Sequence, residues 1–342
     1  MNALRYLAQV LCLLALSTAL ALAGPALWQP PLADLDQVPV WRTGAADLSV
    51  AMTAADARKG QEPRQFAVAL PLPLTVTDGR WSSTGQQATW RARVTSAGAV
   101  MLSLEFEHVV LPQGAELRIY DPQGEMVRGP YTRTDVTADS RLWTALIRGD
   151  TAVIEVDLPV GEQNLLSLQL ALVQHTFAPL GSAAVSDKAS GTSGSCEINA
   201  VCPAGNDWRD EIRSVAMITA SGSAGSFECT GTLLNDVPQD NTPYLLTANH
   251  CGFGTSSEPA ASVTVYWNYQ ALNCAGTRGS LKDAQTGAAV VASNTNSDFA
   301  LLRLDAPPSS SYNVYYAGWD VAGSNPQSGV SIHQPENDIK KI

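Results

Sequence analysis

The sequence predicts an all-β protein with two successive domains, and three observations lead to this prediction. Between residues 62 and 177, apolar and polar residues alternate with a period of two in several stretches. The segment Asp121-Pro122-Gln123-Gly124 has proline second and glycine fourth, which is typical of a type I turn between strands. Further along, residues 227–236, 243–251 and 299–304 contain short apolar runs that indicate strands.

Composition agrees with a globular chain of about two domains. The 342 residues are 45% hydrophobic and 15% charged, which suffices to bury a sizeable core. The net charge of -11 argues against a nucleic-acid partner, because phosphate binding relies on clustered lysine and arginine. The acidic residues are scattered, which indicates a solvated surface rather than a cation site.

Residues 1–23 are expected to be a signal peptide. Arg5 precedes a long apolar run that ends in Ala21-Leu22-Ala23, the small-x-small pattern of a cleavage site after Ala23. A retained membrane anchor is the alternative, but the run is barely long enough to span a bilayer and has no basic flank. We therefore expect a secreted chain, extracellular or periplasmic, that is free of the membrane once the signal is removed.

Residues 62–177 read as one antiparallel β-sandwich. In residues 99–112, apolar side chains alternate with Ser103, Glu105 and Glu107, the pattern of a strand with one buried face. The same alternation sets apolar neighbours against Glu155 and Asp157, and it places four leucines on one side of the next strand: Leu166, Leu168, Leu170 and Leu172. His108 and His175 lie within these strand patterns, and we interpret both as structural.

A linker is expected over residues 178–194, where small and polar residues follow one another without periodicity. Lys188 is a single basic residue in this stretch, as at many exposed cleavage points. The alternative is a flexible linker with an incidental lysine. All five cysteines after the signal lie beyond this linker, which marks a domain boundary: Cys196, Cys202, Cys229, Cys251 and Cys274. Exported cysteines usually pair, so an odd number leaves one without a partner.

His250 stands next to Cys251 at the end of an apolar run. A bridge from Cys251 to Cys229 would close a loop of about 20 residues, be worth on the order of 3 kcal/mol in the chain-entropy model, and fix the histidine beside the first strand. Asp298 precedes the apolar run from Phe299 to Leu304, where a carboxylate could be held in the interior facing a histidine. There it would fix the imidazole tautomer of a general base.

Three motifs in order, CTGTLL, LLTANHC and SDFALLRL, resemble the first half of a trypsin-like serine peptidase. Other segments resemble the bacterial lysyl endopeptidase branch: GTSGSCEINAVCPAGNDWRDEIRSVA, VTVYWNYQALNC and YYAGWD. The resemblance implies the first β-barrel of a chymotrypsin-like double barrel, over residues 189–342. It implies an activation propeptide over residues 24–188, which includes the sandwich.

The resemblance assigns roles residue by residue. His250 matches the general base, and Asp298 matches the carboxylate that orients it. It implies disulfides Cys229–Cys251 and Cys202–Cys274, and it matches Cys196 to a cysteine whose partner lies further downstream in the family. No metal or other cofactor is implied, and the dispersed cysteines form no zinc-like pattern. A metal hydrolase that used His250 and Asp298 as ligands would lack a third ligand.

The family's serine lies in a G-x-S-G-S-P type motif after the aspartate, and nothing between Asp298 and Ile342 matches that motif. Ser193 in GTSGSC imitates it, but this serine precedes the histidine and is followed by cysteine where proline belongs, so we do not expect it to be catalytic. The last segment resembles a strand and turn in mid-domain, and we interpret His333 there as structural. We therefore expect a truncated, inactive precursor that lacks the nucleophile.

The expected full-length protein is a monomeric serine endopeptidase that cleaves protein or peptide substrates, with its own propeptide as a partner. Cleavage after lysine rests on the resemblance. One feature agrees, because the propeptide region has two lysines, Lys59 and Lys188, against 11 arginines. Activation would then cleave after Lys188 and leave Ala189 as the new N-terminus. The alternative is a non-catalytic exported module for binding or adhesion, which would need neither His250 nor Asp298.

Overall fold

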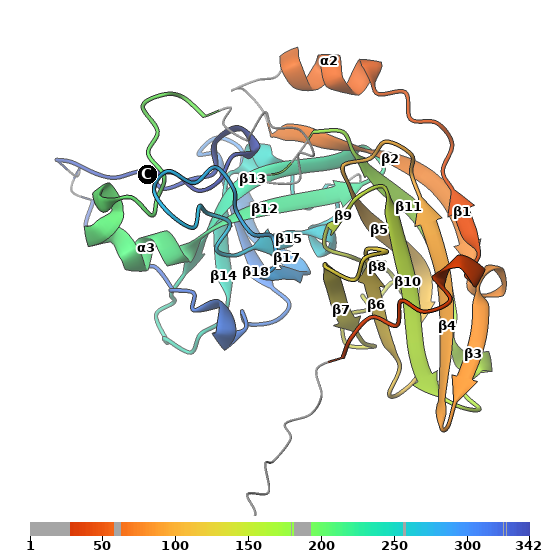
Figure 1. The fold of residues 1–342 in the computed structure, drawn as a ribbon. Coiled ribbons are helices and arrows are strands. Elements are labelled where there is room, and N and C mark those ends of the chain that lie inside the picture. Colours follow the sequence, from red (N-terminus) through yellow and green to blue (C-terminus); the bar gives the residue numbers. More distant parts are fainter. Residues whose placement is uncertain are drawn as a thin grey trace, which may run out of the picture. The chain divides into compact units, whose positions relative to one another are not determined.

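Eleven strands, β1 to β11, form the first part of the described chain, and seven more, β12 to β18, form the second (Figure 1). The computed structural model describes residues 28–57, 63–178, 180, 193–255, 258–323, 325 and 327–342. Residues 32–342 belong to one compact unit, and the description below concerns this unit. The expected all-β fold class is confirmed.

We call strands β1 to β11 the sandwich, because two sheets enclose one apolar core. The first sheet has the order β1-β4-β10-β6-β7, with β3 paired to β4. Its strands are β1 (Val40–Arg42), β3 (Arg80–Thr84), β4 (Gln87–Thr95), β6 (Glu116–Tyr120), β7 (Val127–Tyr131) and β10 (Thr151–Pro159). The facing strands are β2 (Arg64–Thr75), β5 (Met101–Val110), β8 (Leu142–Trp143), β9 (Ile147–Arg148) and β11 (Ser167–Thr176). Apolar residues of both sheets meet in one buried cluster that includes Trp90, Phe106 and Ile154.

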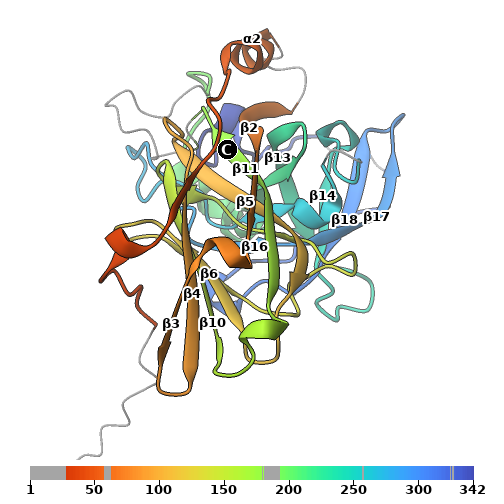
Figure 2. The same ribbon diagram turned by 90° about the vertical axis from the view of Figure 1, so that its right-hand side faces the viewer.

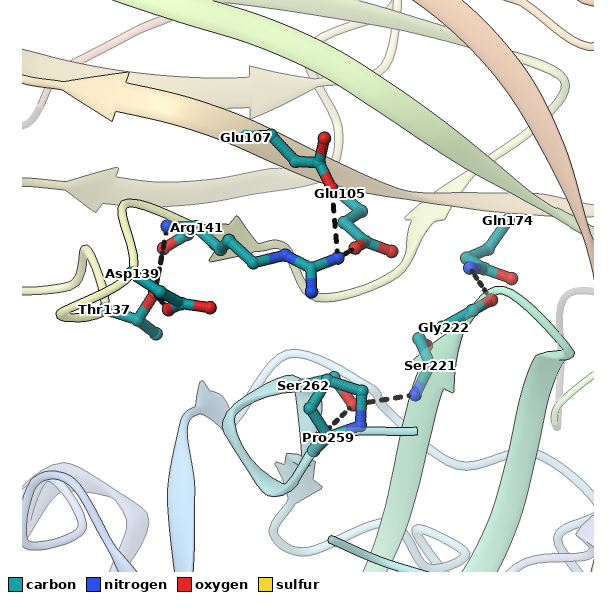
Figure 3. Close-up of polar contacts among 10 residues, drawn as sticks. All are labelled: Glu105, Glu107, Thr137, Asp139, Arg141, Gln174, Ser221, Gly222, Pro259 and Ser262. Atoms are coloured by element: carbon teal, nitrogen blue, oxygen red, sulfur yellow. Dashed lines mark hydrogen bonds and ion pairs between the residues drawn. The ribbon is translucent and has the colours of Figure 1, made fainter. Parts of the chain in front are cut away.

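The prediction of one buried and one exposed face is wrong for β5 and β10. Glu105 and Glu155 are each only 1% exposed, although both alternate with apolar residues. Their charge is compensated: Arg141 contacts Glu105 (Figure 3), while Glu155 accepts hydrogen bonds from Arg91 (2.6 Å) and Tyr120 (2.9 Å). A strand can therefore bury its polar face when arginine partners lie beside it, because a paired charge is much less costly to bury than an isolated one.

The expected leucine stripe on β11 is also only partly observed. Leu166, Leu168 and Leu170 are buried, but the pairing of β11 with both neighbours shifts between Leu170 and Leu172. A bulge of this kind moves the following residues to the opposite face, so Val173 joins the core in place of Leu172.

The turn predicted at residues 121–124 is confirmed. It connects β6 to β7, and the amide of Gly124 donates a hydrogen bond to the carbonyl of Asp121 at 2.9 Å. The carboxylate of Asp121 also accepts hydrogen bonds from the amides of Glu125 and Met126, both at 2.9 Å. The Asp-Pro-Gln-Gly sequence therefore forms the i to i+3 turn that its composition favours.

Strands β12 to β18 form a curved second part, which we call the barrel-like part. They are β12 (Val215–Gly222), β13 (Gly225–Leu234), β14 (Tyr244–Thr247), β15 (Thr264–Tyr266), β16 (Ala284–Thr286), β17 (Ala288–Asn294) and β18 (Phe299–Leu304). Hydrogen bonds lead from β16 through β15, β12, β13, β14 and β18 to β17. The two end strands of this order, β16 and β17, are consecutive in the chain and are separated only by Gly287. The φ of +106° at Gly287 allows the chain to bend there from one end strand to the other.

Strand β2 joins the two parts in one sheet. Its later residues pair with β11, while Arg64, Gln65 and Ala67 pair with β13 of the barrel-like part. Figure 2 shows β2 between β11 and β13. Apolar residues from both sides form a shared cluster that includes Phe66 and Tyr266.

Helices are few and short in the described ranges. The α-helices are α2 (Ser49–Ala57) and α3 (Arg209–Ser214), and 3₁₀ turns include η1 (Leu35–Gln37), η2 (Val76–Asp78), η3 (Gln163–Leu165), η5 (Pro203–Trp208), η6 (Asn249–Cys251), η7 (Ala260–Ser262), η8 (Ser310–Tyr312) and η9 (Pro335–Asn337). None of the helices within these ranges has the length and apolar character needed to cross a membrane.

Candidate functional site

The His250 turn begins where β14 ends. The hydroxyl of Thr247 donates to the carbonyl of Thr230 on β13 at 2.9 Å, which anchors the end of β14. The chain then forms η6 and leaves it at Gly252, whose φ of +74° is the left-handed conformation that glycine adopts without strain. The backbone of His250 is therefore fixed from both sides.

Asp298 lies opposite this turn, at the start of β18. Its Oδ1 accepts a hydrogen bond from the His250 amide at 2.9 Å, and its Oδ2 lies 2.7 Å from Nδ1 of the ring. These two contacts, led by the one with the ring, lower the pKa of Asp298 below its usual value of 3.8. The carboxylate therefore stays ionised and orients the imidazole so that Nε2 points away from it.

The expectation that Asp298 is held in the interior is wrong. Its side chain is 50% exposed and that of His250 is 51% exposed. Asp298 has a φ of +51°, because it closes the turn between β17 and β18, and this turn lies at the surface. In the described residues the pair is thus open to solvent on one side, and no described residue hydrogen-bonds to Nε2 of His250.

The described part of the chain contains two disulfides, one of them beside the histidine. Cys229 on β13 is bonded to Cys251, next to the histidine, and Cys202 is bonded to Cys274. Cys196 is a free, exposed thiol among the described residues.

Cys229, His250 and Cys251 also place a sulfur, a nitrogen and a sulfur within 4.8 Å of one another, a spacing that could hold a metal. Both sulfurs are joined in a disulfide, so they are not thiolates and cannot act as metal ligands in this state.

The remaining candidate residues lie elsewhere. The hydroxyl of Ser193 donates to Asp338 at 2.6 Å rather than to His250. His108 is exposed on β5, whereas His175 is buried with Nδ1 at 2.8 Å from the Ser96 hydroxyl. Nε2 of His333 lies 3.4 Å from the carboxylate of Glu197. Lys59, the proposed cleavage sites after Ala23 and Lys188, and most of the linker lie outside the described residues.

The sequence did not point to Thr247 as an anchor, although it belongs to the TANHC segment. The only sequence feature that could have indicated this role is a β-branched residue with a hydroxyl group at the end of a predicted strand. Two large cavities, of about 530 and 270 Å³, are lined by residues such as Arg128 and Lys282 and not by His250. Cavity size therefore does not identify the His250–Asp298 pair as the candidate site.

Comparison with known proteins adds to this geometry. The lysyl endopeptidase of Pseudomonas aeruginosa is 29% identical over 318 residues, and the match covers 85% of this chain and 66% of that protein. The chain thus spans just under two thirds of that relative's length. A model of the lysyl endopeptidase N-terminal domain matches residues 42–177, and a model of the lysyl endopeptidase C-terminal domain matches residues 190–342. Together they account for most of the sequence, and the chain belongs to the lysyl endopeptidase family.

Proposed function

We propose that this chain is the precursor region of a secreted serine endopeptidase in which His250 is the general base and Asp298 orients it. The observation that carries the proposal is the pair of hydrogen bonds from the His250 amide and ring to the two oxygens of Asp298. The Cys229–Cys251 bridge holds this histidine against β13. Membership of the lysyl endopeptidase family supports a serine nucleophile and peptide substrates.

The chemistry follows from the orientation of the ring. With its Nδ1–H held by Asp298, Nε2 is free to take the proton of a serine hydroxyl as the serine oxygen bonds to the peptide carbonyl carbon. The resulting imidazolium, stabilised by Asp298, gives that proton to the leaving amine as the C–N bond breaks. Water then hydrolyses the acyl ester by the same route. We propose that the serine reaches Nε2 from a segment outside residues 1–342, so that these residues alone do not hydrolyse peptides.

The precursor organisation is part of the proposal. Residues 1–23 are the signal peptide, residues 24–188 the propeptide and residues 189–342 the first part of the peptidase domain. Cleavage after Lys188 would separate the last two, and a preference for lysine would spare the arginine-rich propeptide, which has 11 arginines and two lysines. The family name of the matched relative supports this preference. N-terminal sequencing of mature protein that showed Lys188 still attached would contradict the assigned cleavage site.

Substitution His250→Ala in the full-length secreted protein tests the function. We expect peptide hydrolysis after lysine to fall by at least about 10⁴-fold, because the general base is removed, while secretion is unchanged. His108→Asn is the matched control, since His108 is exposed on the sandwich and its φ of +52° suits asparagine. Unchanged hydrolysis in the His250 variant would refute the proposal and favour the non-catalytic binding module.

A further inference from the structure

Arg128 on β7 is a buried cation that has no carboxylate partner in the described part of the chain. The residue is 5% exposed, and its guanidinium makes three contacts: to the carbonyls of Leu146 at 2.7 Å and Lys282 at 3.4 Å, and to Sδ of Met126 at 3.6 Å. A guanidinium has five N–H donors, so two of them, one on each terminal nitrogen, have no acceptor among the described residues. Because an uncompensated buried charge is costly, this position favours an anion.

A cavity of about 530 Å³ adjoins this arginine, and residues of both the sandwich and the barrel-like part line it. We call it the seam cavity. The sandwich side comes from β5, β7, β9 and the turn before β7, while the other side is the loop 279–282 between β15 and β16. Its volume lies within the range of pockets that hold small molecules.

The charges that line the seam cavity are mainly positive. Arg128, Arg148 and Lys282 stand against one carboxylate, that of Glu125. Glu125 lies 3.7 Å from Arg148, and their side chains are 69% and 48% exposed, so solvent screens this pair. The excess of cations contrasts with the net charge of -11 for the whole chain. The cavity is thus suited to an anion.

The neighbouring cavity of about 270 Å³ does not share this excess. Arg128 and Lys282 line it too, but so do Asp135 and Asp305, and its charges therefore balance. The distribution of charge thus directs an anion bound to Arg128 to the seam cavity.

Apolar side chains form much of the remaining wall: Met101, Met126, Val127, Leu180 and Leu281. Met101 and Leu180 are fully buried, and methionine side chains adapt well to apolar ligands. On the barrel-like side the loop packs closely, since a Cβ at Gly279 would lie 2.7 Å from the ring of Tyr269. A ligand that fills this cavity therefore needs an apolar portion beside its charge.

We propose that the seam cavity is a binding site for a carboxylate with an apolar chain, such as a medium-chain fatty acid. The two terminal nitrogens of Arg128 each keep one N–H for the ligand, which matches the two oxygens of a carboxylate. Lys282 and Arg148 add attraction, and the chain lies against Met101 and Met126. The inference does not depend on the proposed peptidase function.

The test uses the full-length precursor with His250→Ala, so that self-processing does not separate the two parts, and decanoate as the probe. Decanol has the same chain length without the charge, and butyrate has the charge on a shorter chain. Calorimetric titration gives the Kd of each compound. The ¹³C-methyl signals of methionine locate the site, because Met101 and Met126 line the cavity, whereas Met217 is buried in the same apolar cluster as Met101 and does not line it.

Three variants separate the charge of the cavity from charge in general. Arg128→Met removes the buried guanidinium. Lys282→Gln removes an exposed charge at the cavity and keeps the test decisive if Arg128→Met does not fold. Arg42→Gln removes an exposed charge on β1, away from the cavity, and is the matched control.

We expect decanoate to shift the signals of Met101 and Met126 and to leave that of Met217 in place. Decanol should bind at least about tenfold more weakly, because the hydrogen bonds to a charged group are lost. Butyrate should bind at least about 100-fold more weakly, because its chain buries several fewer CH₂ groups. The Kd of decanoate should rise at least about tenfold in Arg128→Met and about threefold in Lys282→Gln, and it should stay unchanged in Arg42→Gln.

Decanoate that leaves Met101 and Met126 unshifted at millimolar concentration would show that the cavity holds only water and would overturn the inference. Decanol that binds as tightly as decanoate, or equal Kd values in Lys282→Gln and Arg42→Gln, would overturn it too. Acetylated trileucine, a peptide with a free carboxylate, separates two sources of such a ligand. Binding of either compound at the two methionines supports the site, and the tighter one shows whether a lipid or a peptide C-terminus fits it better.

Discussion

Replacement of Asp298 by asparagine gives the sharpest prediction for the His250–Asp298 pair. The asparagine oxygen can keep the bond to the His250 amide, now 2.9 Å, but its NH₂ group then faces Nδ1 in place of Oδ2. Nδ1 must accept this hydrogen bond, so the ring proton moves to Nε2. That nitrogen can then no longer accept the proton of the nucleophile.

The expected loss is on the order of 10⁴-fold in kcat, as for the equivalent change in such triads. This loss corresponds to about 5 kcal/mol of transition-state stabilisation. The fold should tolerate the change, because asparagine is among the residues that best accept the φ of +51° at this position.

Two assays check this prediction. Ring ¹⁵N chemical shifts of His250 report the tautomer in the chain itself, and steady-state hydrolysis reports kcat in the full-length protein. Asp305→Asn, just after the other end of β18, is the control for the same chemical change away from the histidine. An Nδ1–H tautomer that persists in Asp298→Asn, or a kcat within tenfold of wild type, would refute the reasoning.

Three further predictions concern stability. Replacing both cysteines by serine should lower the free energy of unfolding by about 3 kcal/mol for the Cys229–Cys251 bridge and by about 4 kcal/mol for Cys202–Cys274. The second loss is larger because that bridge closes a loop of 72 rather than 22 residues. Urea unfolding that gives the reverse order would contradict this prediction. The pKa of Asp298 is lowered in the folded state, so its hydrogen bonds to His250 should be fully formed above pH 3.8. They should be lost only as the pH falls through the pKa of Asp298 in the folded protein, which lies below 3.8. NMR that shows these hydrogen bonds already lost at pH 5 would refute this prediction. Burial lowers the pKa of Lys340 from 10.5 to about 7. Between these two pH values the lysine is protonated in the unfolded state but neutral in the folded state. The free energy of unfolding should therefore rise with pH by about 1.4 kcal/mol per unit in this range. Lys340→Met should remove that rise in urea unfolding, and parallel pH curves for the two proteins would exclude it.

The local sequence pattern predicted strands and turns correctly, but it did not predict which polar side chains of those strands are buried. The alternation in residues 101–110 predicted β5, and Asp-Pro-Gln-Gly predicted the turn before β7. Neither pattern shows that Glu105 is buried, because its partner Arg141 lies 36 residues away. The bulge near Leu172 was equally hidden, since it depends on how β11 fits between β2 and β5.

At the candidate site, the motifs around His250 and Asp298 identified two side chains that the fold does bring within hydrogen-bonding distance. The sequence could not predict that Asp298 is half exposed, because exposure depends on what covers the turn between β17 and β18. It also gave no indication that β2 pairs with β13. Residues 64 and 228 are far apart in the chain, and such long-range pairing leaves no local pattern.

A serine-directed phosphonate would test the central claim most directly. The full-length secreted protein and its His250→Ala variant are treated with a fluorophosphonate, and the labelled residue is found by peptide mapping. The account predicts one label per molecule on a serine outside residues 1–342, formed on the order of 10⁴-fold more slowly in the variant because the base is lost. A label on Ser193, equal labelling rates in both proteins, or no label at all would contradict it.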